Sequence, residues 1–337
     1  MNYRVSVAMC TFNGSKFIRE QLTSIINQTR HPDQIIICDD ISTDNTIEII
    51  QSILEKTSIK WTILINDSRL GVAKNFEKAI GLCNGDIIFT SDQDDYWIEY
   101  KIERILDEFQ RNPDANLVFS NARLVDTHLM ELSGNLWKTI GFSNKNLKED
   151  KIYILELLLQ NNFVTGATMA FRKEILNRII PIPNNWIHDY WIALQCLIEG
   201  KIIGIPEMLI LYRQHGQNVI GAKQLSLTSK IKKYLSNFKC VDEIHRQKLI
   251  MIKELVCNLE AGNKDIDKNI LNKIKECKGF WERRDNQLNN SKLFALKEVL
   301  SDIMNYNYNK YYTGIRGAMR DMLVVICPDI IKNSKER

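Results

Sequence analysis

The sequence predicts an α/β fold, in which short β-strands alternate with helices, followed by a basic and largely helical C-terminal region. Three observations lead to this prediction. Runs rich in Ile and Val recur along the first half of the chain. The segments between these runs carry apolar residues at helical spacing. Polar residues gather directly after several of the runs, and the carboxyl ends of parallel strands are where such sheets bind ligands.

Five apolar runs have the length and composition of strands, and they occupy residues 5–9, 34–38, 61–65, 86–90 and 116–120. Between them, apolar residues recur at helical spacing over 18–26, 47–54, 76–83 and 102–109. Because strands that alternate with helices pair in parallel, we expect a parallel sheet whose two faces are both covered by helices.

The pattern becomes less regular after the fifth strand. Residues 124–150 lack clear periodicity, which predicts a long loop over the sheet. A helix over 152–159, a strand over 168–171 and a helix over 186–199 are expected next. From about residue 222 the chain has a helical pattern and is rich in Asn and Lys. We therefore predict two domains, 1–221 and 222–337.

The composition is that of a globular protein, with 337 residues, 45% hydrophobic and 26% charged side chains. No stretch approaches about 18 consecutive apolar residues, and the N-terminus lacks the regions of a signal peptide. The eight cysteines are scattered, without a CxxC pair. These features predict a cytoplasmic protein with reduced thiols. The excess of Lys and Arg lies in residues 222–337, which indicates an anionic partner, with a lipid surface or nucleic acid as candidates.

The strongest chemical signal is the segment Asp92-Gln93-Asp94-Asp95, which directly follows the fourth predicted strand. Three carboxylates this close repel one another, and a divalent cation such as Mg²⁺ or Mn²⁺ relieves the repulsion. A solvated acidic turn is the alternative for the tetrapeptide alone. Its position at the end of a strand favours a cation site.

A second pair of carboxylates, Asp39 and Asp40, follows the second predicted strand. Ser42, Thr43 or Asp44 can cap the helix behind them, but capping does not account for this pair. A carboxylate at a strand end can accept a hydrogen bond from a nucleobase imide or from a ribose hydroxyl.

The first predicted strand ends in Thr11-Phe12-Asn13-Gly14. This end offers a hydroxyl, an aromatic face on which a base can stack, and a flexible turn. The three strand ends together provide groups suited to a nucleotide and a cation.

These motifs resemble glycosyltransferase family 2, whose members have the GT-A fold. The matching pieces, in order, are residues 5–13, Asp39-Asp40 with Ser42 and Asp44, Gly71 with Lys74-Asn75, and residues 92–95. The resemblance covers roughly residues 3–221. It implies a Rossmann-like mixed sheet with a C-terminal helical extension, and a nucleotide sugar lying across the strand ends.

The resemblance also implies roles for the matched residues. Thr11, Phe12, Asn13, Asp39 and Asp40 would hold the base and ribose of the donor. Asp92 and Asp94 would form the DxD element that binds the metal and the diphosphate, and Gln93 and Asp95 would contact the donor. Lys74 is a candidate diphosphate contact, although a helix lysine that lies along the protein surface is equally common.

Two later segments complete the implied site. Residues 164–168, with Gly166 at the centre, are similar to the family's small-residue turn beneath the donor sugar. His188-Asp189, at the start of a predicted helix, resembles the family's catalytic carboxylate site, so Asp189 is the candidate general base. His188 would steer Asp189 or the sugar. A helix cap is the structural alternative for Asp189.

An inverting transfer needs one carboxylate to take the proton from an acceptor hydroxyl as its oxygen attacks the anomeric carbon. Farther on, the resemblance makes His215 the third metal ligand beside Asp92 and Asp94, and makes Arg213 a candidate for the diphosphate charge. The segments 188–191 and 212–221 look like the branch of bacterial rhamnosyltransferases that build surface polysaccharides. This likeness implies dTDP-rhamnose as donor and a growing glycan, carried on polyprenyl diphosphate, as acceptor.

The C-terminal region carries an apolar stripe with Arg316 and Arg320 beside it. The stripe consists of Ile315, Met319, Met322, Leu323 and Ile326. Packing against the catalytic domain is the commoner explanation of such a stripe, and an interfacial helix at the cytoplasmic leaflet of the plasma membrane is the alternative. No nucleic-acid motif accompanies the tyrosines of this region, so nucleic acid is not an expected partner.

Other classes of function fit the sequence less well. An aspartate-dependent phosphohydrolase would need its aspartate pair after the first strand, where this chain has Thr11 and Asn13. A non-catalytic binder of sugar nucleotides would not need Asp189. A dehydrogenase is disfavoured because Gly14 stands outside a GxGxxG motif.

Overall fold

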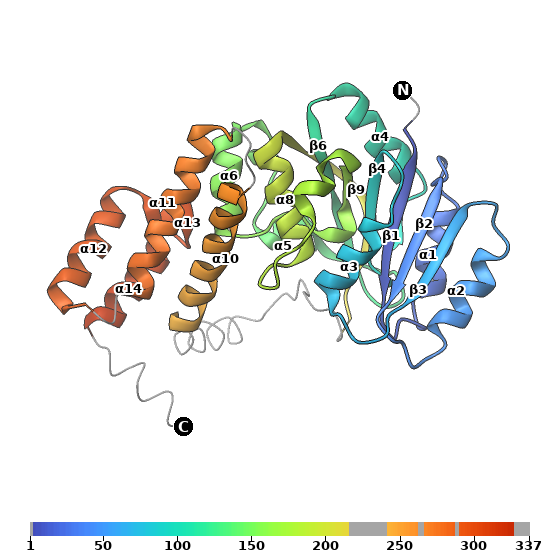
Figure 1. Cartoon of the computed structure of the whole chain (residues 1–337), viewed down its shortest axis with the longest axis horizontal. Coiled ribbons are helices and arrows are strands. Elements are labelled where there is room, and N and C mark those ends of the chain that lie inside the picture. The colour runs from blue at the N-terminus through green and yellow to red at the C-terminus, as the bar shows by residue number, and fades with distance from the viewer. Residues whose placement is uncertain (1–2, 216–240, 262–265, 287–289, 327–337) are drawn as a thin grey trace. The chain divides into compact units, whose positions relative to one another are not determined.

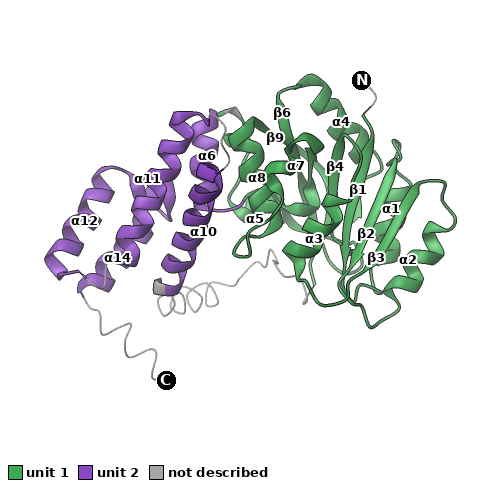
Figure 2. Ribbon diagram, in the orientation of Figure 1, with its two compact units in different colours: residues 1–149, 163–223 green, residues 150–162, 224–337 purple. Residues whose placement is uncertain are grey.

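The chain folds into two compact units (Figures 1 and 2). The structure is a computed structural model and describes residues 3–215, 241–261, 266–286 and 290–326. The first unit comprises residues 1–149 and 163–223, and the second comprises 150–162 and 224–337. The segment 150–162 therefore groups with the C-terminal helices, whereas the sequence analysis assigned it to the first domain.

In the part of the chain that the structure describes, the first unit holds a nine-stranded sheet of order β3-β2-β1-β4-β8-β6-β9-β5, with β7 paired to β6 (Figure 1). The strands are β1 (Val5–Thr11), β2 (Gln34–Asp39), β3 (Lys60–Ile65), β4 (Ile87–Ser91), β5 (Tyr96–Trp97), β6 (Ala115–Val125), β7 (Glu131–Asn135), β8 (Met169–Arg172) and β9 (Lys201–Arg213). From β3 to β4 the pairing is parallel, as the alternation predicted. Because β8 is antiparallel to both β4 and β6, the whole sheet is mixed.

Helices connect and cover the strands of this unit. They are α1 (Ile18–Ile26), α2 (Thr46–Leu54), α3 (Val72–Gly81), α4 (Lys101–Arg111), α5 (Leu136–Ile140), α7 (Leu176–Ile179) and α8 (His188–Glu199). Alternate residues of β1, namely Val5, Val7 and Met9, are buried in one cluster with apolar residues of α1, α2 and α4. Successive residues of a strand point to opposite faces, so these three helices share one face of the sheet.

The prediction of a long loop over 124–150 was wrong. β6 continues to Val125, and β7 and α5 follow within the segment. The β7 sequence alternates poorly because most of its side chains are exposed, so no apolar face marks it as a strand. Pairing with β6 supplies the order that the local pattern does not show.

The second unit consists of helices, which confirms the helical pattern of the C-terminal region over the described residues. These helices are α6 (Lys151–Gln160), α10 (Val241–Ala261), α11 (Lys268–Asp285), α12 (Lys292–Met304), α13 (Asn307–Tyr311) and α14 (Ile315–Ile326). Among the described residues, none of the helices has both the length and the apolar character needed to cross a bilayer.

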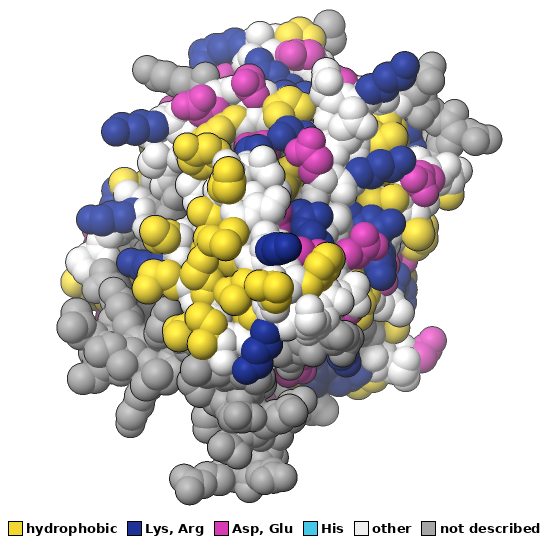
Figure 3. All heavy atoms as spheres, turned by 90° about the vertical axis from the view of Figure 1, so that its left-hand side faces the viewer, with side chains coloured by type: hydrophobic (Ala, Val, Ile, Leu, Met, Phe, Trp, Pro, Cys, Tyr) yellow, Lys and Arg dark blue, Asp and Glu magenta, His cyan; other side chains and the backbone are white. Residues whose placement is uncertain are grey.

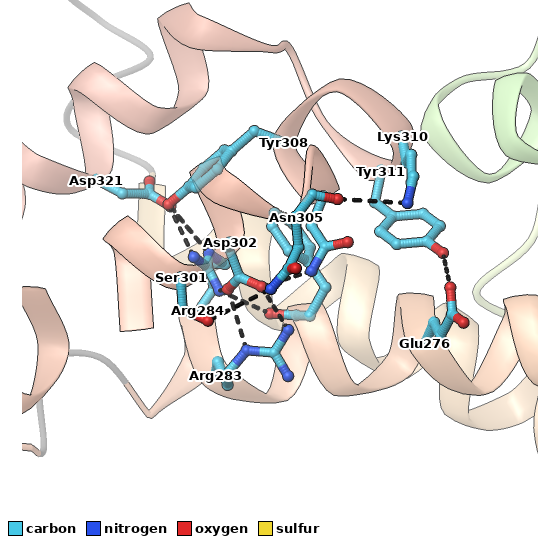
Figure 4. Close-up of polar contacts among 12 residues, drawn as sticks. Glu276, Arg283, Arg284, Ser301, Asp302, Asn305, Tyr308, Lys310, Tyr311 and Asp321 are labelled. Atoms are coloured by element: carbon cyan, nitrogen blue, oxygen red, sulfur yellow. Dashed lines mark hydrogen bonds and ion pairs between the residues drawn. The ribbon is translucent and has the colours of Figure 1, made fainter. Parts of the chain in front are cut away.

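A buried cluster of charged and polar side chains joins four helices of this unit, α11 to α14 (Figure 4). The guanidinium of Arg284 on α11 donates to the carboxylates of Asp302 on α12 and Asp321 on α14, and to the hydroxyl of Tyr308. Burial alone would raise the pKa of Asp302, but the bonds from Arg283 and Arg284 outweigh it and lower the pKa. The inner sides of α12 and α14 are thus held by charge as well as by apolar packing.

Candidate functional site

The carboxyl ends of β1, β2 and β4 lie side by side. Thr11 of β1 is opposite Asp39 of β2, and Met9 of β1 is opposite Ser91 of β4. The polar residues that follow these strands therefore meet at one edge of the sheet, as the sequence predicted.

Carboxylates from distant parts of the chain converge near this edge. The pKa of the Tyr212 phenol is raised mainly by burial, and the charges of Asp95, Asp92, Asp94 and Asp189 raise it further. The four carboxylates therefore all lie near Tyr212, although Asp95 and Asp189 come from different segments of the chain.

The acidic segment after β4 carries carboxyls whose ionised form is disfavoured. Burial raises the pKa of Asp92 to about 7, with further contributions from Asp94 and Asp189. Burial and the charges of Asp94 and Asp92 also raise the pKa of Asp95 well above its usual range. Oδ2 of Asp95 is buried without a hydrogen-bond partner among the described residues. A cation bound beside these groups would favour their ionised form.

His215 lies against the same segment. Its Nε2 is 2.8 Å from Oδ2 of Asp94, and its ring centroid is 5.0 Å from that of Phe17. In the described residues, no group of three or more His, Cys, Asp or Glu side chains is arranged to hold a metal ion. Mg²⁺ is commonly held by one or two carboxylates together with substrate phosphates, so the Asp94–His215 pair fits a cation that a diphosphate helps to bind.

A buried lysine beside the acidic segment was missed by the sequence analysis. Lys101, the first residue of α4, is fully buried, and its Nζ donates to the carbonyl of Ala167 at 2.8 Å. The ammonium also lies 3.5 Å from the ring centroid of Trp97. Burial lowers the pKa of Lys101, whereas Asp95 and Asp92 raise it. A lysine at the start of a helix is usually solvated, so no local pattern marked this position.

Phe12 and Gln93 hold the first strand end against the acidic segment. The side-chain amide of Gln93 accepts from Phe12 N at 2.8 Å and donates to Phe12 O at 3.0 Å. Both polar atoms of this amide are therefore used to fix the backbone of Phe12. The guanidinium of Arg69 stacks over the Phe12 ring at 3.5 Å from its centroid. Arg69 is a second residue that the sequence analysis did not single out.

Thr11, Asp39 and Asn13 form a polar junction between β1 and β2. Thr11 Oγ1 donates to Asp39 Oδ2 at 2.6 Å, and Ser42 donates to the same carboxylate through both its N–H and its hydroxyl. Asn13 has a φ of 47°. Its side-chain oxygen accepts from Thr43 N, and its backbone N–H donates to the Ser42 hydroxyl. The predicted donor-binding residues at this end thus hold one another in place.

The carboxylate of Asp40 holds the loop after β3 by accepting from backbone N–H groups of that loop. Its Oδ1 accepts from Leu70 N at 2.7 Å and its Oδ2 accepts from Gly71 N at 2.9 Å. Asn66 donates to the same carboxylate at 3.1 Å. Burial alone would raise the pKa of Asp40, but these hydrogen bonds outweigh it and lower the pKa. The carboxylate thus fixes the loop that carries Arg69 at the edge of the site.

Asp189 stands at the start of α8 and is held by backbone donors. Gly166 N donates to its Oδ2 at 2.9 Å, and Tyr190 N donates to its Oδ1 at 2.6 Å. The turn that contains Gly166 is fixed in turn by Thr90, whose hydroxyl donates to Gly166 O at 2.6 Å. The predicted small-residue turn and the predicted base are therefore in direct contact.

His188 packs against this turn in its neutral form. A Cβ at Gly166 would lie 2.7 Å from Nε2 of His188, so only glycine fits there without displacement. The His188 ring stacks on Phe76 with centroids 3.8 Å apart, and neither ring nitrogen has a hydrogen-bond partner among the described residues. Burial lowers the pKa of His188 to about 3, so the ring remains uncharged at neutral pH.

Lys74 is bound by neighbouring protein groups. Its ammonium donates to Glu77 at 2.7 Å and to the carbonyl of Ile182 at 2.6 Å. Glu77 also accepts from Ile182 N. The side chain thus joins α3 to the chain ahead of α8, and contact with a diphosphate would require it to leave these partners.

Arg213 has a position different from the one predicted. The family resemblance implied a contact with the diphosphate, but the side chain of Arg213 is fully buried. The guanidinium donates to Asp94 O, Thr127 O and the carboxylate of Glu20, and the backbone N–H donates to Asp95 Oδ1. Arg213 therefore positions the loop of Asp94 and Asp95 from the protein interior.

Arg213→Met is expected to lower the free energy of unfolding by about 2–4 kcal/mol, because the carbonyls of Asp94 and Thr127 would lose their buried donor, whereas the half-exposed Glu20 can turn to water. Thermal and urea denaturation measure this change. Arg123→Met removes an exposed arginine of β6, whose ion pair with Glu131 spans 3.6 Å, and serves as the control with an expected loss of under about 1 kcal/mol. Equal stabilities of the two variants would contradict the positioning role.

Comparison with known proteins gives one family. The family described as "Glycosyl transferase family 2" matches residues 6–180 of the chain. The dTDP-rhamnosyl transferase RfbG of Shigella flexneri is 28% identical over 82% of this chain and 94% of its own length. For two other curated relatives, the glycosyltransferase alr2836 of Nostoc and the protein Mb1547 of Mycobacterium bovis, the chain spans 66% and 60% of the relative's length.

Two solved structures have a similar fold. The TarS protein of S. aureus, residues 1–349 in complex with UDP-GlcNAc, superposes with a TM-score of 0.58 at 14% identity and covers 99% of this chain and 90% of its own. The mannosyltransferase PcManGT of Pyrobaculum calidifontis, in complex with GDP-Man and Mn²⁺, has a TM-score of 0.53 at 16% identity. It covers 100% of this chain and 83% of its own.

Proposed function

Because this chain belongs to glycosyl transferase family 2 and has the GT-A fold, we propose that it transfers a sugar, with inversion, from a nucleotide diphosphate to a hydroxyl group. One observation carries the proposal. Asp189, from the start of α8, accepts from Gly166 N at 2.9 Å, and Gly166 O accepts at 2.6 Å from Thr90 of β4, the strand that leads into the acidic segment. A candidate base and a candidate diphosphate site are thereby brought together.

Asp189 is proposed as the general base. Gly166 N and Tyr190 N fix its carboxylate, so the group is oriented before an acceptor arrives. The carboxylate removes the proton of the acceptor hydroxyl as that oxygen attacks the anomeric carbon, while the nucleotide diphosphate leaves from the opposite side. General-base assistance of this kind is worth about 10²- to 10⁴-fold in rate.

The leaving group is a diphosphate, and Mg²⁺ or Mn²⁺ is the proposed cofactor. Asp94 and His215 would hold the cation together with the diphosphate oxygens. Asp92, whose pKa is raised in part by Asp94, is the other carboxylate proposed as a ligand. When bound, the cation supplies positive charge that stabilises the departing diphosphate. Arg213 keeps the carbonyl of Asp94 and the carboxylate of Asp95 in place beside it.

The base and ribose are proposed to lie over the junction of β1 and β2. Asn13 is exposed in this region, and Phe12 provides an aromatic ring whose backbone Gln93 fixes. The buried Thr11–Asp39 pair supports this strand end, and its contact with the donor remains part of the proposal. Arg69 lies over that ring and is 3.7 Å from Asp40, so it is placed to meet the edge of a base. For Lys74 to contact the diphosphate, its ammonium would have to leave Glu77 and Ile182 O.

The proposed donor is dTDP-rhamnose, and the proposed acceptor is a growing bacterial surface glycan on polyprenyl diphosphate at the cytoplasmic face of the plasma membrane. The rhamnosyl transferase relative, 28% identical over 82% of the chain, supports this donor. The structural neighbours were solved with UDP-GlcNAc and GDP-Man, so the fold itself accommodates more than one nucleotide and sugar.

A screen of nucleotide sugars tests the proposal. In the presence of Mn²⁺, dTDP-rhamnose at about 100 times its dissociation constant is expected to stabilise the chain by about 2.7 kcal/mol, which raises Tm by several degrees. UDP-GlcNAc and GDP-mannose are the matched comparisons, and slow hydrolysis of the donor is the second readout. If none of the nucleotide sugars raises Tm or is hydrolysed, the proposed function is wrong. A response to a different sugar would replace only the donor.

A further inference from the structure

Two helices of the second unit expose a continuous apolar surface. On α12 it consists of Leu293, Leu300 and Met304, and on α14 of Ile315, Met319 and Ile326. We call these six residues the apolar face, and their side chains are between 49% and 78% exposed. Figure 3 shows hydrophobic side chains gathered on this side of the molecule, with lysines and arginines among and around them.

The two stripes lie next to each other because the helices pack in opposite directions. On α12 the residues recur at i, i+7 and i+11, and on α14 at i, i+4 and i+11, which places each set on one side of its helix. Lys292 Nζ donates to Ile326 O at 3.4 Å, so the start of α12 meets the end of α14. The stripes therefore form one surface rather than two separate ones.

The exposed charges that α12 and α14 themselves place beside the apolar face are positive. Lys297 lies within the α12 stripe, between Leu293 and Leu300, and Lys292 and Arg316 are exposed beside the face. The acidic residues Asp302 and Asp321 are buried against Arg284 on the inner side. Among the described residues 290–326, the only other acidic side chain is Glu298, which is half-buried.

This arrangement does not suit a second copy of the chain. A two-fold interface would bring the Lys297 side chains and their basic neighbours towards those of the partner, without exposed carboxylates on these helices to neutralise them. Burying an ammonium without a counterion is strongly unfavourable. A membrane avoids this problem, because the methylene stem of Lys297 can lie along the apolar face while its ammonium reaches lipid phosphates.

We propose that the apolar face of α12 and α14 binds the surface of an anionic lipid bilayer, with Lys297, Lys292 and Arg316 contacting the headgroups. The proposal deepens the membrane location proposed above for the acceptor. Lipid binding needs neither donor nor sugar transfer, so a vesicle assay without donor can fail while the transferase activity stands, and the reverse also holds.

Sedimentation with vesicles tests the proposal on the full chain. We expect the protein to bind vesicles of phosphatidylcholine mixed with phosphatidylglycerol, and to bind pure phosphatidylcholine vesicles much more weakly. Lys297→Glu changes two units of charge and is expected to reduce partitioning to the anionic vesicles about 25-fold. The double variant Leu300→Glu/Met319→Glu is expected to reduce it by about 100-fold or more.

Two matched variants control for general effects of charge and hydrophobicity. Lys268→Glu reverses an exposed lysine on α11, and Met130→Glu replaces a methionine of the first unit that is 66% exposed. Both are expected to bind vesicles like the parent chain. Circular dichroism and Tm show whether each variant is folded. If the double variant is not, Lys297→Glu still tests the proposal, because it alters only an exposed side chain.

Three outcomes would overturn the proposal. The first is equal binding by the parent chain and both test variants, or no binding at all. The second is a dimer of the parent chain, detected by analytical ultracentrifugation, that Leu300→Glu/Met319→Glu dissociates, because a second copy would then cover the face. The third is vesicle binding that appears only after residues 327–337 are deleted, because that segment would then be the occupant.

Discussion

Asp189→Asn is expected to lower kcat for sugar transfer by about 10²- to 10⁴-fold while the dissociation constant of the donor changes little. Asparagine has nearly the same shape and its oxygen can still accept from Gly166 N, whereas its amide nitrogen cannot accept from Tyr190 N. An unchanged Tm shows that the turn remains in place. Asparagine cannot accept the proton of the acceptor hydroxyl at neutral pH. Steady-state kinetics at saturating donor and calorimetry of donor binding measure the two quantities separately.

Asp114→Asn is the matched control for this variant. The carboxylate of Asp114 is 70% exposed in the same unit, and its loss is expected to leave kcat unchanged. Transfer by Asp189→Asn at a rate close to that of the parent chain would remove Asp189 as the base. If the parent chain bound a donor but transferred nothing to any acceptor, the chain would instead be a binding protein.

The second large effect is expected at the proposed metal pair. Asp94→Ala and His215→Ala should each weaken Mn²⁺-dependent donor binding by about 100-fold, because each removes one of the two protein groups that lie 2.8 Å apart. The two losses should not add in the double variant, since both groups serve one site. Calorimetry with and without Mn²⁺ measures donor binding. Loss of the electron paramagnetic resonance signal of free Mn²⁺ measures binding of the metal.

His31→Ala is the control for the metal experiment, because His31 is exposed and lies ahead of β2, at the opposite end of that strand from Asp39. It is expected to leave Mn²⁺-dependent binding intact. Donor affinity that is the same with and without Mn²⁺ in the parent chain would exclude the metal role of Asp94 and His215 together.

The sequence was sufficient to predict the strand ends of the site. Apolar runs and helical spacing are local features, and they placed Thr11, Asp39 and Asp92 after three neighbouring strands. The family resemblance added the later segments, because the spacing between Asp92 and Asp189 carries no periodic signal. Features that strand and helix patterns encode locally were therefore predicted best.

The sequence could not show which charged side chains are buried. Arg213 and Asp95 are 118 positions apart and meet only because β9 pairs with β5 and β6. Lys101 likewise donates to the carbonyl of Ala167, which is 66 positions farther along the chain. Whether a cation is solvated or enclosed depends on such long-range contacts, so the roles of Arg213 and Lys101 required the structure.

The Arg284 cluster determines which sides of α12 and α14 point outward. Asp302 and Asp321 each bond to the same guanidinium, so neither helix can rotate about its axis without abandoning a charge in a dry interior (Figure 4). Substitutions on the outer sides therefore leave the angular setting of both helices unchanged. The residues on the outer sides of α12 and α14 can therefore change during evolution while the packing of the two helices stays the same.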